Sequence, residues 1–295
     1  MPDAKTTLFV LLGAVAFAFV ILLARAALLA RRAGGERVLP DAWELFVGFL
    51  TNFFDTLGIG SFATTTALYR WRRTIDDRLL PGTLNVGHTL PTFAQAYIFI
   101  DKIGIEMGTL VWMIVAATAG SLLGAPIVAR LPRRAVQLGL GSALLVLCGV
   151  LVFRQLWKEP EAGTLGLEGS LFAIGVASNF VLGALMTIGV GLYAPCLVLV
   201  SMLGMNPKAG FPIMMGSCAF LMPVASVPFV LARSYSPRAV LGLAVGGLPA
   251  VFLAYKFFSN LPLYWVKWII AVVVIYTAIT LLRAAAREKN REAAV

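Results

Sequence analysis

The sequence predicts an all-α polytopic membrane protein made of two inverted repeats, and three observations support this fold class. The 295 residues are 60% hydrophobic and 13% charged, whereas about 25% of the residues of a soluble domain are charged. Nine apolar stretches are long enough to be membrane segments, which need about 20 apolar residues to cross a bilayer. The third observation is an internal repeat, in which two interrupted apolar segments share matching glycines and asparagines.

Helices are expected throughout, because a bilayer leaves no water to satisfy an irregular backbone. The apolar stretches run over 7–30, 43–69, 82–101, 106–129, 135–156, 168–204, 209–232, 238–257 and 263–283. They predict an N-terminal transmembrane helix with a cytoplasmic loop, a first repeat, a linker, and a second repeat with a cytoplasmic tail. These parts are placed at 1–40, 41–157, 158–167 and 168–295.

Two interrupted segments carry the repeat. The first reads FVGFLTNFFDTLGIGSFATTTALYR and the second reads FAIGVASNFVLGALMTIGVGLYAPCLVLV. Asn52 recurs as Asn179 and Gly60 recurs as Gly191, with nearly the same spacing between the members of each pair. Glycine breaks at corresponding positions of two repeats are typical of the binding site of a secondary transporter. Each repeat is therefore expected to contain a discontinuous or re-entrant helical hairpin followed by three transmembrane helices.

The positions of the basic residues predict the topology. If both interrupted segments return to their own side of the membrane, 17 of the 24 Lys and Arg residues lie on the side of the C-terminal tail. An excess of basic residues marks the cytoplasmic side. This predicts seven full crossings and two hairpins, with the N-terminus outside and the C-terminus cytoplasmic. Each repeat then makes an odd number of crossings, which inverts one repeat relative to the other.

The helix breaks predict an anion site near the membrane midplane. A break frees N–H groups at the start of the second half-helix, and these groups attract anions. Inversion would bring two such helix starts toward the centre. The expected substrate-binding residues are Asn52, Gly58, Gly60, Ser61, Thr64, Thr65, Asn179, Gly189, Gly191 and Tyr193. The alternative interpretation of these residues is close packing of membrane helices through small side chains.

Two titratable residues within the predicted membrane segments are candidates for proton coupling. Asp55 lies beside the first break, where it either carries a proton or caps the following helix. His88 is the single histidine and shares one helical face with Asn85 and Thr89. It either relays protons or hydrogen-bonds between helices. A second hypothesis is a cation or metal-ion transporter with Asp55, His88 and Asn85 as ligands.

Other functional classes find no support in the sequence. The net charge of +10 indicates cytoplasmic loops that face anionic lipid, not a nucleic-acid partner. The three cysteines are dispersed in apolar segments, which fits neither a disulfide framework nor a metal cluster. Motifs for nucleotide binding or hydrolysis are missing, so we expect no enzyme, no catalytic residue and no cofactor. The expected partners are a small anionic substrate and the lipid bilayer, and the sequence also allows a homodimer.

The chain resembles the TauE/SafE family of sulfite exporter-like membrane transporters in two features. One is the pair of segments NFFDTLGIGSFATTTAL and NFVLGALMTIGVGLYAPCLVL. The other is the organisation of each repeat as one hairpin followed by three transmembrane helices. The resemblance covers about 43–283. It implies a multi-pass transporter of the bacterial inner membrane for small sulfur-containing anions such as sulfite or organosulfonates of the sulfoacetate type. Family members carry a Gly-rich run and then a Pro in each interrupted segment. Here Pro195 is present in the second segment, and the first segment has neither the triple glycine nor the Pro.

Overall fold

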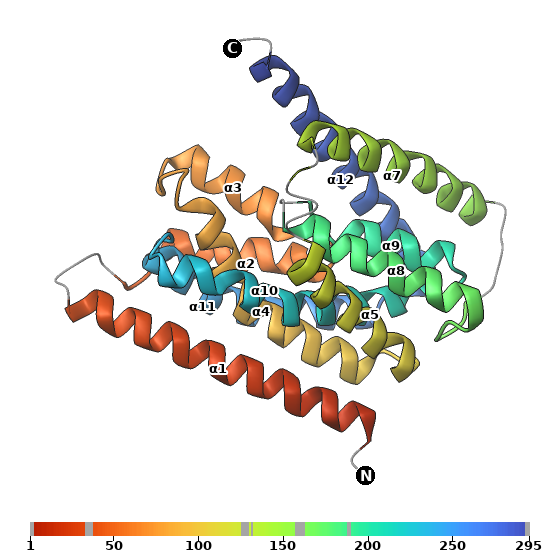
Figure 1. The fold of residues 1–295 in the computed structure, drawn as a ribbon, viewed down its shortest axis with the longest axis horizontal. Helices are drawn as coiled ribbons and strands as arrows, with labels where there is room; N and C mark the ends of the chain where they lie inside the picture. Colours follow the sequence, from red (N-terminus) through yellow and green to blue (C-terminus); the bar gives the residue numbers. More distant parts are fainter. Residues whose placement is uncertain are drawn as a thin grey trace. The chain divides into compact units, whose positions relative to one another are not determined.

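The computed structural model of the chain describes residues 3–32, 38–124, 130, 132–156, 163–187 and 190–292. These residues form helices and no strand, apart from an isolated bridge between Thr164 and Met205. The elements are α1 (Ala4–Arg32), α2 (Ala42–Thr56), α3 (Ser61–Arg72), α4 (Leu80–Lys102), α5 (Met107–Ala119), the π-helical η1 (Gly120–Gly124), α7 (Arg133–Leu156), α8 (Gly169–Met186), α9 (Tyr193–Met202), the short η2 (Pro207–Ala209), α10 (Gly210–Leu231), α11 (Pro237–Ser259) and α12 (Leu263–Glu292) (Figure 1). The all-α fold class is confirmed, and the inversion of the repeats stays a prediction.

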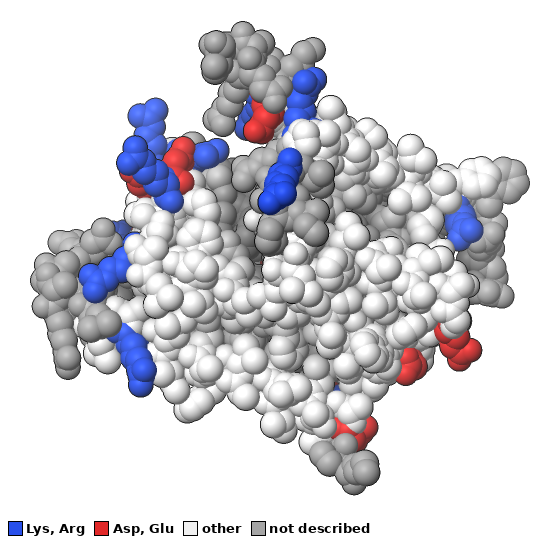
Figure 2. All heavy atoms as spheres, in the orientation of Figure 1, with Lys and Arg blue, Asp and Glu red and all other residues white. Residues whose placement is uncertain are grey.

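Seven helices in the described part of the chain are long and apolar enough to cross a membrane. They are α1, α5 with η1, α7, α8, η2 with α10, α11 and α12. The number agrees with the prediction, but α8 takes the place of α4. Although α4 has 23 residues, its polar face lowers its hydropathy, whereas α8 has no charged residue and few polar ones. Residues without charge cover most of the face shown in Figure 2. The chain is therefore a multi-pass membrane protein.

The helices form two compact units, and each unit takes helices from both predicted repeats. Unit 1 comprises Met1–Lys102 and Cys218–Asn260, and unit 2 comprises Ile103–Ser217 and Leu261–Val295. In unit 1, α11 packs along both α2 and α4. In unit 2, α8 packs along α5 and η1, and α7 packs along α12. In both units, the first helix of one interrupted segment thus lies against a helix of the other repeat.

The same asparagine contact holds this helix pair together in each unit. In unit 1, Asn52 Nδ2 on α2 donates to the carbonyl oxygen of Leu243 on α11 at 3.3 Å. In unit 2, Asn179 Nδ2 on α8 donates to the carbonyl oxygen of Met113 on α5 at 2.7 Å. The two donors and the two acceptors are separated by almost the same length of chain, which matches the spacing of the sequence repeat. The repeat therefore extends to individual tertiary contacts.

Glycines allow the backbones of these helix pairs to approach closely. In unit 1, a Cβ atom added to Gly48 would collide with the carbonyl oxygen of Gly242. A Cβ atom added to Gly246 would likewise collide with the backbone of α2. In unit 2, a Cβ atom added to Gly183 would collide with the carbonyl oxygen of Ala117. Lipid tails are as apolar as leucine side chains, so membrane helices associate through such close packing.

Both predicted helix interruptions are present. Residues 57–60 separate α2 from α3, and there Gly58 and Gly60 have positive φ angles of 99° and 77°. Glycine adopts this left-handed backbone without the penalty that a Cβ atom brings. The second interruption lies between the end of α8 at Met186 and the start of α9 at Tyr193.

Candidate functional site

The break between α2 and α3 brings a carboxylate to the start of a helix. Asp55, in the last turn of α2, is only 4% exposed. Its Oδ1 atom accepts a hydrogen bond from the backbone N–H of Ser61, the first residue of α3, at 2.7 Å. Gln95 Nε2 on α4 donates to Asp55 Oδ2 and to Thr56 Oγ1, each at 3.0 Å. The capping role considered for Asp55 is thus observed in the structure, together with a contact to α4.

Asp55 accepts a hydrogen bond from only one of the backbone N–H groups at the start of α3. The N-cap residue is Gly60, which has no side chain to accept a hydrogen bond. The N–H groups of Phe62 and Ala63 also belong to the first turn, where a helix contains no acceptor for them. A Cβ atom added to Gly60 would meet no atom within 4 Å. The start of α3 therefore lies beside open space and has N–H groups beyond the one bound to Asp55.

The hydroxyl groups that follow the break face in different directions. Thr64 donates to the carbonyl oxygen of Ser61 at 2.9 Å, and Thr66 donates to that of Phe62 at 2.7 Å. Both hydroxyl protons are thus engaged by the backbone of α3 itself. Thr65 is fully buried and turns toward α4.

His88 lies in a fully buried network that joins α2, α3 and α4. Asn52 Nδ2 donates to the carbonyl oxygens of Gly48 and Leu243, so its Oδ1 atom faces His88 Nδ1, at 2.9 Å. An amide oxygen only accepts, so His88 carries a proton on Nδ1. In the neutral ring, Nε2 then accepts from the hydroxyl of Thr65 at 3.0 Å. This geometry favours the interhelical hydrogen-bond role considered for His88.

The corresponding asparagine in unit 2 has fewer partners. Asn179 Nδ2 donates to the carbonyl oxygen of Met113 and to Ser217 Oγ, the latter at 3.2 Å. Its Oδ1 atom is buried and has no hydrogen-bond partner among the described residues. Leu182 follows Asn179 at the same interval at which Asp55 follows Asn52. The two breaks therefore differ in chemistry: a carboxylate and a histidine network accompany only the first.

The start of α9 has no side-chain cap, because its N-cap residue is Leu192. Gly191 is exposed, whereas Tyr193 is 8% exposed and begins the helix. Gly189, which was also predicted for the site, lies outside the described residues. Of the predicted residues in unit 1, the structure brings Asn52, Thr65 and His88 into one network and Asp55 and Ser61 into a second.

Gln95 is a site residue that the sequence prediction did not include. It lies two helical turns after His88, which puts both side chains on the same face of α4. That spacing is the signal that could have identified it. Asn85, the third residue of the metal-ion hypothesis, donates instead to the carbonyl oxygen of Pro81 at 3.0 Å. The described residues contain no group of three or more His, Cys, Asp or Glu side chains placed to hold a metal ion.

Comparison with known protein families identifies a family for most of the chain. A family model described as "Sulfite exporter TauE/SafE" matches residues 45–281, which include both interrupted segments and most of the chain. Comparisons with curated proteins and with solved structures gave no match.

Proposed function

Because the chain belongs to the sulfite exporter TauE/SafE family, we propose that it is a secondary transporter of a small sulfur oxyanion or organosulfonate in the bacterial inner membrane, with the N-terminus outside and the C-terminus cytoplasmic. The observation that carries the detailed proposal is the hydrogen bond from the Ser61 N–H to the Asp55 carboxylate. A negative charge of the protein itself lies at the helix start where the sequence predicts the negative charge of the substrate.

Two negative charges do not share one helix start without a large repulsion. At a separation of a few ångströms, this repulsion is about 4 kcal/mol near a protein surface, where the effective dielectric constant is roughly 20. A proton on Asp55 removes the repulsion and leaves the N–H groups at the start of α3 to the substrate. The anion and the proton therefore bind together, and the loss of one promotes the release of the other.

Gln95 suits both protonation states of Asp55. Its Nε2 atom now donates to Asp55 Oδ2. After rotation of the amide, its oxygen would accept a hydrogen bond from the protonated carboxyl group. The buried Asp55 carboxyl group would thus keep a hydrogen-bond partner in both its ionised and its protonated state. This avoids the cost of an unpaired buried polar group.

We assign proton coupling to Asp55 and a positioning role to His88. Both ring nitrogens of neutral His88 already have partners, Asn52 and Thr65. A second ring proton, on Nε2, would require the Thr65 hydroxyl to turn from donor to acceptor, and it would place a full charge in this buried network. In unit 2, Leu182 stands at the position that matches Asp55, so the proposal requires one proton-binding carboxylate per chain.

The test is transport by the purified full-length protein in proteoliposomes. Uptake of radiolabelled sulfite and of sulfoacetate is measured with an imposed pH gradient, acidic on the side of substrate addition. We expect uptake above that of protein-free liposomes, and we expect it to fall when a protonophore collapses the gradient. The absence of flux for both anions would overturn the substrate class. Flux that ignores the gradient would overturn the coupling.

A further inference from the structure

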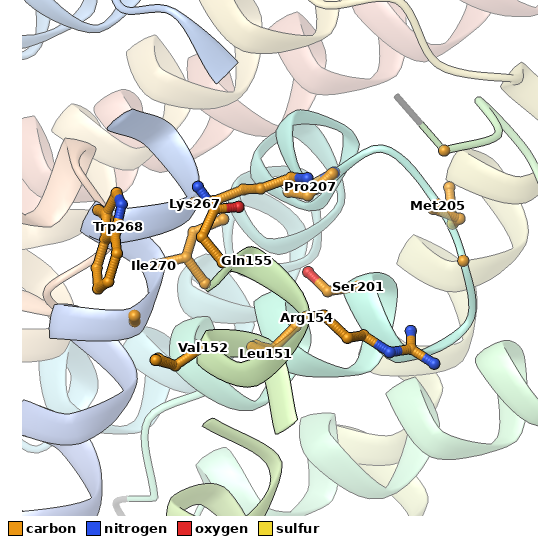
Figure 3. Close-up of a pocket in the computed structure, with 13 residues that line it drawn as sticks. Leu151, Val152, Arg154, Gln155, Ser201, Met205, Pro207, Lys267, Trp268 and Ile270 are labelled. Atoms are coloured by element: carbon orange, nitrogen blue, oxygen red, sulfur yellow. The ribbon is translucent and has the colours of Figure 1, made fainter. Parts of the chain in front are cut away.

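Unit 2 contains a cavity of about 180 Å³ that is separate from both helix breaks. The last turns of α7 and α9, the segment leading into η2 and the first turns of α12 form its walls (Figure 3). Its polar side chains are Arg154 and Gln155 on α7, Ser201 on α9 and Lys267 on α12. Apolar side chains such as Leu151 line the rest.

Lys267 places a positive charge, unpaired among the described residues, in the wall of the cavity. Arg154 and Lys267 both line the cavity, and no Asp or Glu is among its described lining residues. Within the described part of the chain, no carboxylate forms an ion pair with Lys267. The carboxyl-terminal ends of α7 and α9 carry negative partial charges of about half an elementary charge each. The anion site is therefore the part of the wall around the ammonium group of Lys267, which projects from α12 (Figure 3).

The cavity wall also supplies hydrogen-bond donors for such an anion. The hydroxyl of Ser201 donates to the carbonyl oxygen of Leu197 at 2.8 Å, so it is not a free donor. Lys267, Arg154 and Gln155 contribute an ammonium, a guanidinium and an amide group to the wall, and each of these groups can donate hydrogen bonds. In Figure 3, the Arg154 side chain extends toward the loop that carries Met205, whereas Lys267 projects from α12.

Aromatic side chains beside the cavity indicate that it lies near the lipid head groups. Tyr264 and Trp265, in the first turn of α12, are each 55% exposed. Trp268, one turn later, lines the cavity, and its ring lies 6.3 Å from that of Tyr264. Exposed Tyr and Trp side chains at a helix end mark the boundary between membrane and water. A ligand there is reached from the water or from the adjacent leaflet.

The size and lining of the cavity limit the ligand. A volume of about 180 Å³ is below the roughly 300–1,000 Å³ of pockets for drug-sized molecules. It suits a single charged head group with a short apolar portion against Leu151 and Ile270.

We propose that this cavity is a second oxyanion site, which binds a phosphate or sulfonate group at the membrane interface. The group comes either from an anionic phospholipid or from a small anion in solution. Lys267 is the main ionic partner, because it projects from the apolar helix α12 into the cavity without a carboxylate neighbour among the described residues. None of the residues proposed for transport belongs to this cavity, so either proposal can fail without the other.

The experiment measures binding to the delipidated full-length protein in a neutral detergent. The probes are inorganic phosphate, methanesulfonate, short-chain phosphatidylglycerol and short-chain phosphatidylcholine, and the readout is the rise in Tm with concentration. Lys267→Gln is compared with Lys267→Arg and with Lys256→Gln, which changes a lysine of unit 1. A charged hydrogen bond accounts for about a tenfold change in affinity, so Lys267→Gln should raise the apparent Kd about tenfold. The other two variants should match the wild type.

Each arm of the experiment has an assigned meaning. Stabilisation by phosphate and methanesulfonate that depends on Lys267 identifies a small anion as the ligand. Stabilisation by phosphatidylglycerol alone, with the same dependence, identifies a lipid head group. Equal affinity of Lys267→Gln and the wild type for every probe, or no stabilisation by any probe, overturns the site.

Discussion

The Oδ1 atom of Asp55 lies 2.7 Å from the backbone nitrogen of Ser61, across the break between α2 and α3. The acid and the helix start were both identified from the sequence, as separate candidates for proton coupling and for anion binding. In the proposed mechanism, the substrate and the Asp55 carboxylate compete for the same N–H groups. The contact is the reason why we propose that proton binding and anion binding are linked.

Asp55→Asn should abolish the pH dependence of substrate binding. In the proposed mechanism, the wild-type protein binds the anion together with a proton on Asp55, so its affinity should rise as the pH falls, by up to about tenfold per pH unit. Asparagine is permanently neutral and keeps an oxygen for the Ser61 N–H. We therefore expect the variant to bind sulfoacetate with the same affinity from slightly acidic to slightly alkaline pH, as measured by titration of the purified protein.

The matched control for this change is Asp101→Asn, which removes an acid of the same unit that pairs with Lys5 and Lys102. It should bind sulfoacetate with the pH dependence of the wild type. In proteoliposomes, Asp55→Asn should exchange substrate across the membrane but should not accumulate it along a pH gradient. A pH dependence retained by Asp55→Asn would show that another group carries the proton.

Gly60→Ala should destabilise the fold because alanine is strained at the backbone conformation of this residue, without any steric clash of the new methyl group. The φ angle of Gly60 is 77°, and the added Cβ would meet no atom within 4 Å. The left-handed conformation costs an L-residue about 1–2 kcal/mol. Gly191→Ala is the control, since Gly191 also has open space around a Cβ but does not have a positive φ. In denaturant titrations, the free energy of unfolding should fall for Gly60→Ala and should stay close to the wild-type value for Gly191→Ala.

Asn52→Ala should destabilise the protein more than Asn179→Ala. The first change leaves His88 Nδ1 and the Leu243 carbonyl oxygen without their side-chain partner. Each buried polar group that is left unpaired costs about 1–3 kcal/mol. The second change removes the Nδ2 contacts of Asn179, but its Oδ1 atom has no described partner to lose. Equal losses in chemical unfolding would contradict the network around His88.

Gly246→Ala should disturb the packing of α2 on α11. The new Cβ would collide with the carbonyl oxygen of Leu45, a backbone atom that cannot rotate away. Overpacking of this kind costs about 1–3 kcal/mol. Gly139→Ala, in α7, is the control because its Cβ would meet nothing within 4 Å. The Tm of the two variants in detergent should differ by several degrees, and similar values would argue against close backbone contact.

Glu106→Gln should lower stability at neutral pH but not in acid. Hydrogen bonds from the side chain and backbone of Thr109 at the start of α5 hold the pKa of the Glu106 carboxyl below its usual range. A carboxyl group with a lowered pKa stabilises the folded state above its unfolded pKa, about 4.3, and loses this contribution as the pH falls through its folded pKa. For an exposed cap we expect about 0.5–1 kcal/mol at neutral pH. The free energy of unfolding of the variant and of the wild type is measured at neutral pH and at a pH well below the unfolded pKa. An equal difference between the two proteins at both pH values would contradict the prediction.

Much of the fold follows from local patterns in the sequence. Runs of about 20 apolar residues specify membrane helices whatever their neighbours, because the bilayer itself is the solvent that selects them. The glycines at 58 and 60 mark the first break, since few other residues adopt positive φ. The count of basic residues and the hydropathy of the helices select different crossings: the count predicts α4 as a crossing and α8 as part of a hairpin, whereas α8 and not α4 has the composition of a membrane span.

The contacts of the site could not be predicted in the same way. The spacing of Asp55 and Ser61 is compatible with many loop conformations, and only one of them aims the carboxylate at the N–H. Gln95 reaches Asp55 from α4, a helix that is separated from the break by the whole of α3 and a further loop. The sequence contains no local signal for such a contact, because it depends on how α2, α3 and α4 pack.

The sequence by itself determined the membrane class, the helices, the two breaks and the family, because each depends on the composition or order of neighbouring residues. Tertiary structure decided the partners: Asp55 with Ser61 and Gln95, His88 with Asn52 and Thr65, and Arg154 with Lys267 around one cavity. The physical reason is that hydrogen bonds and ion pairs act over a few ångströms. Side chains that are far apart in the chain come within that range only when the helices that carry them pack together.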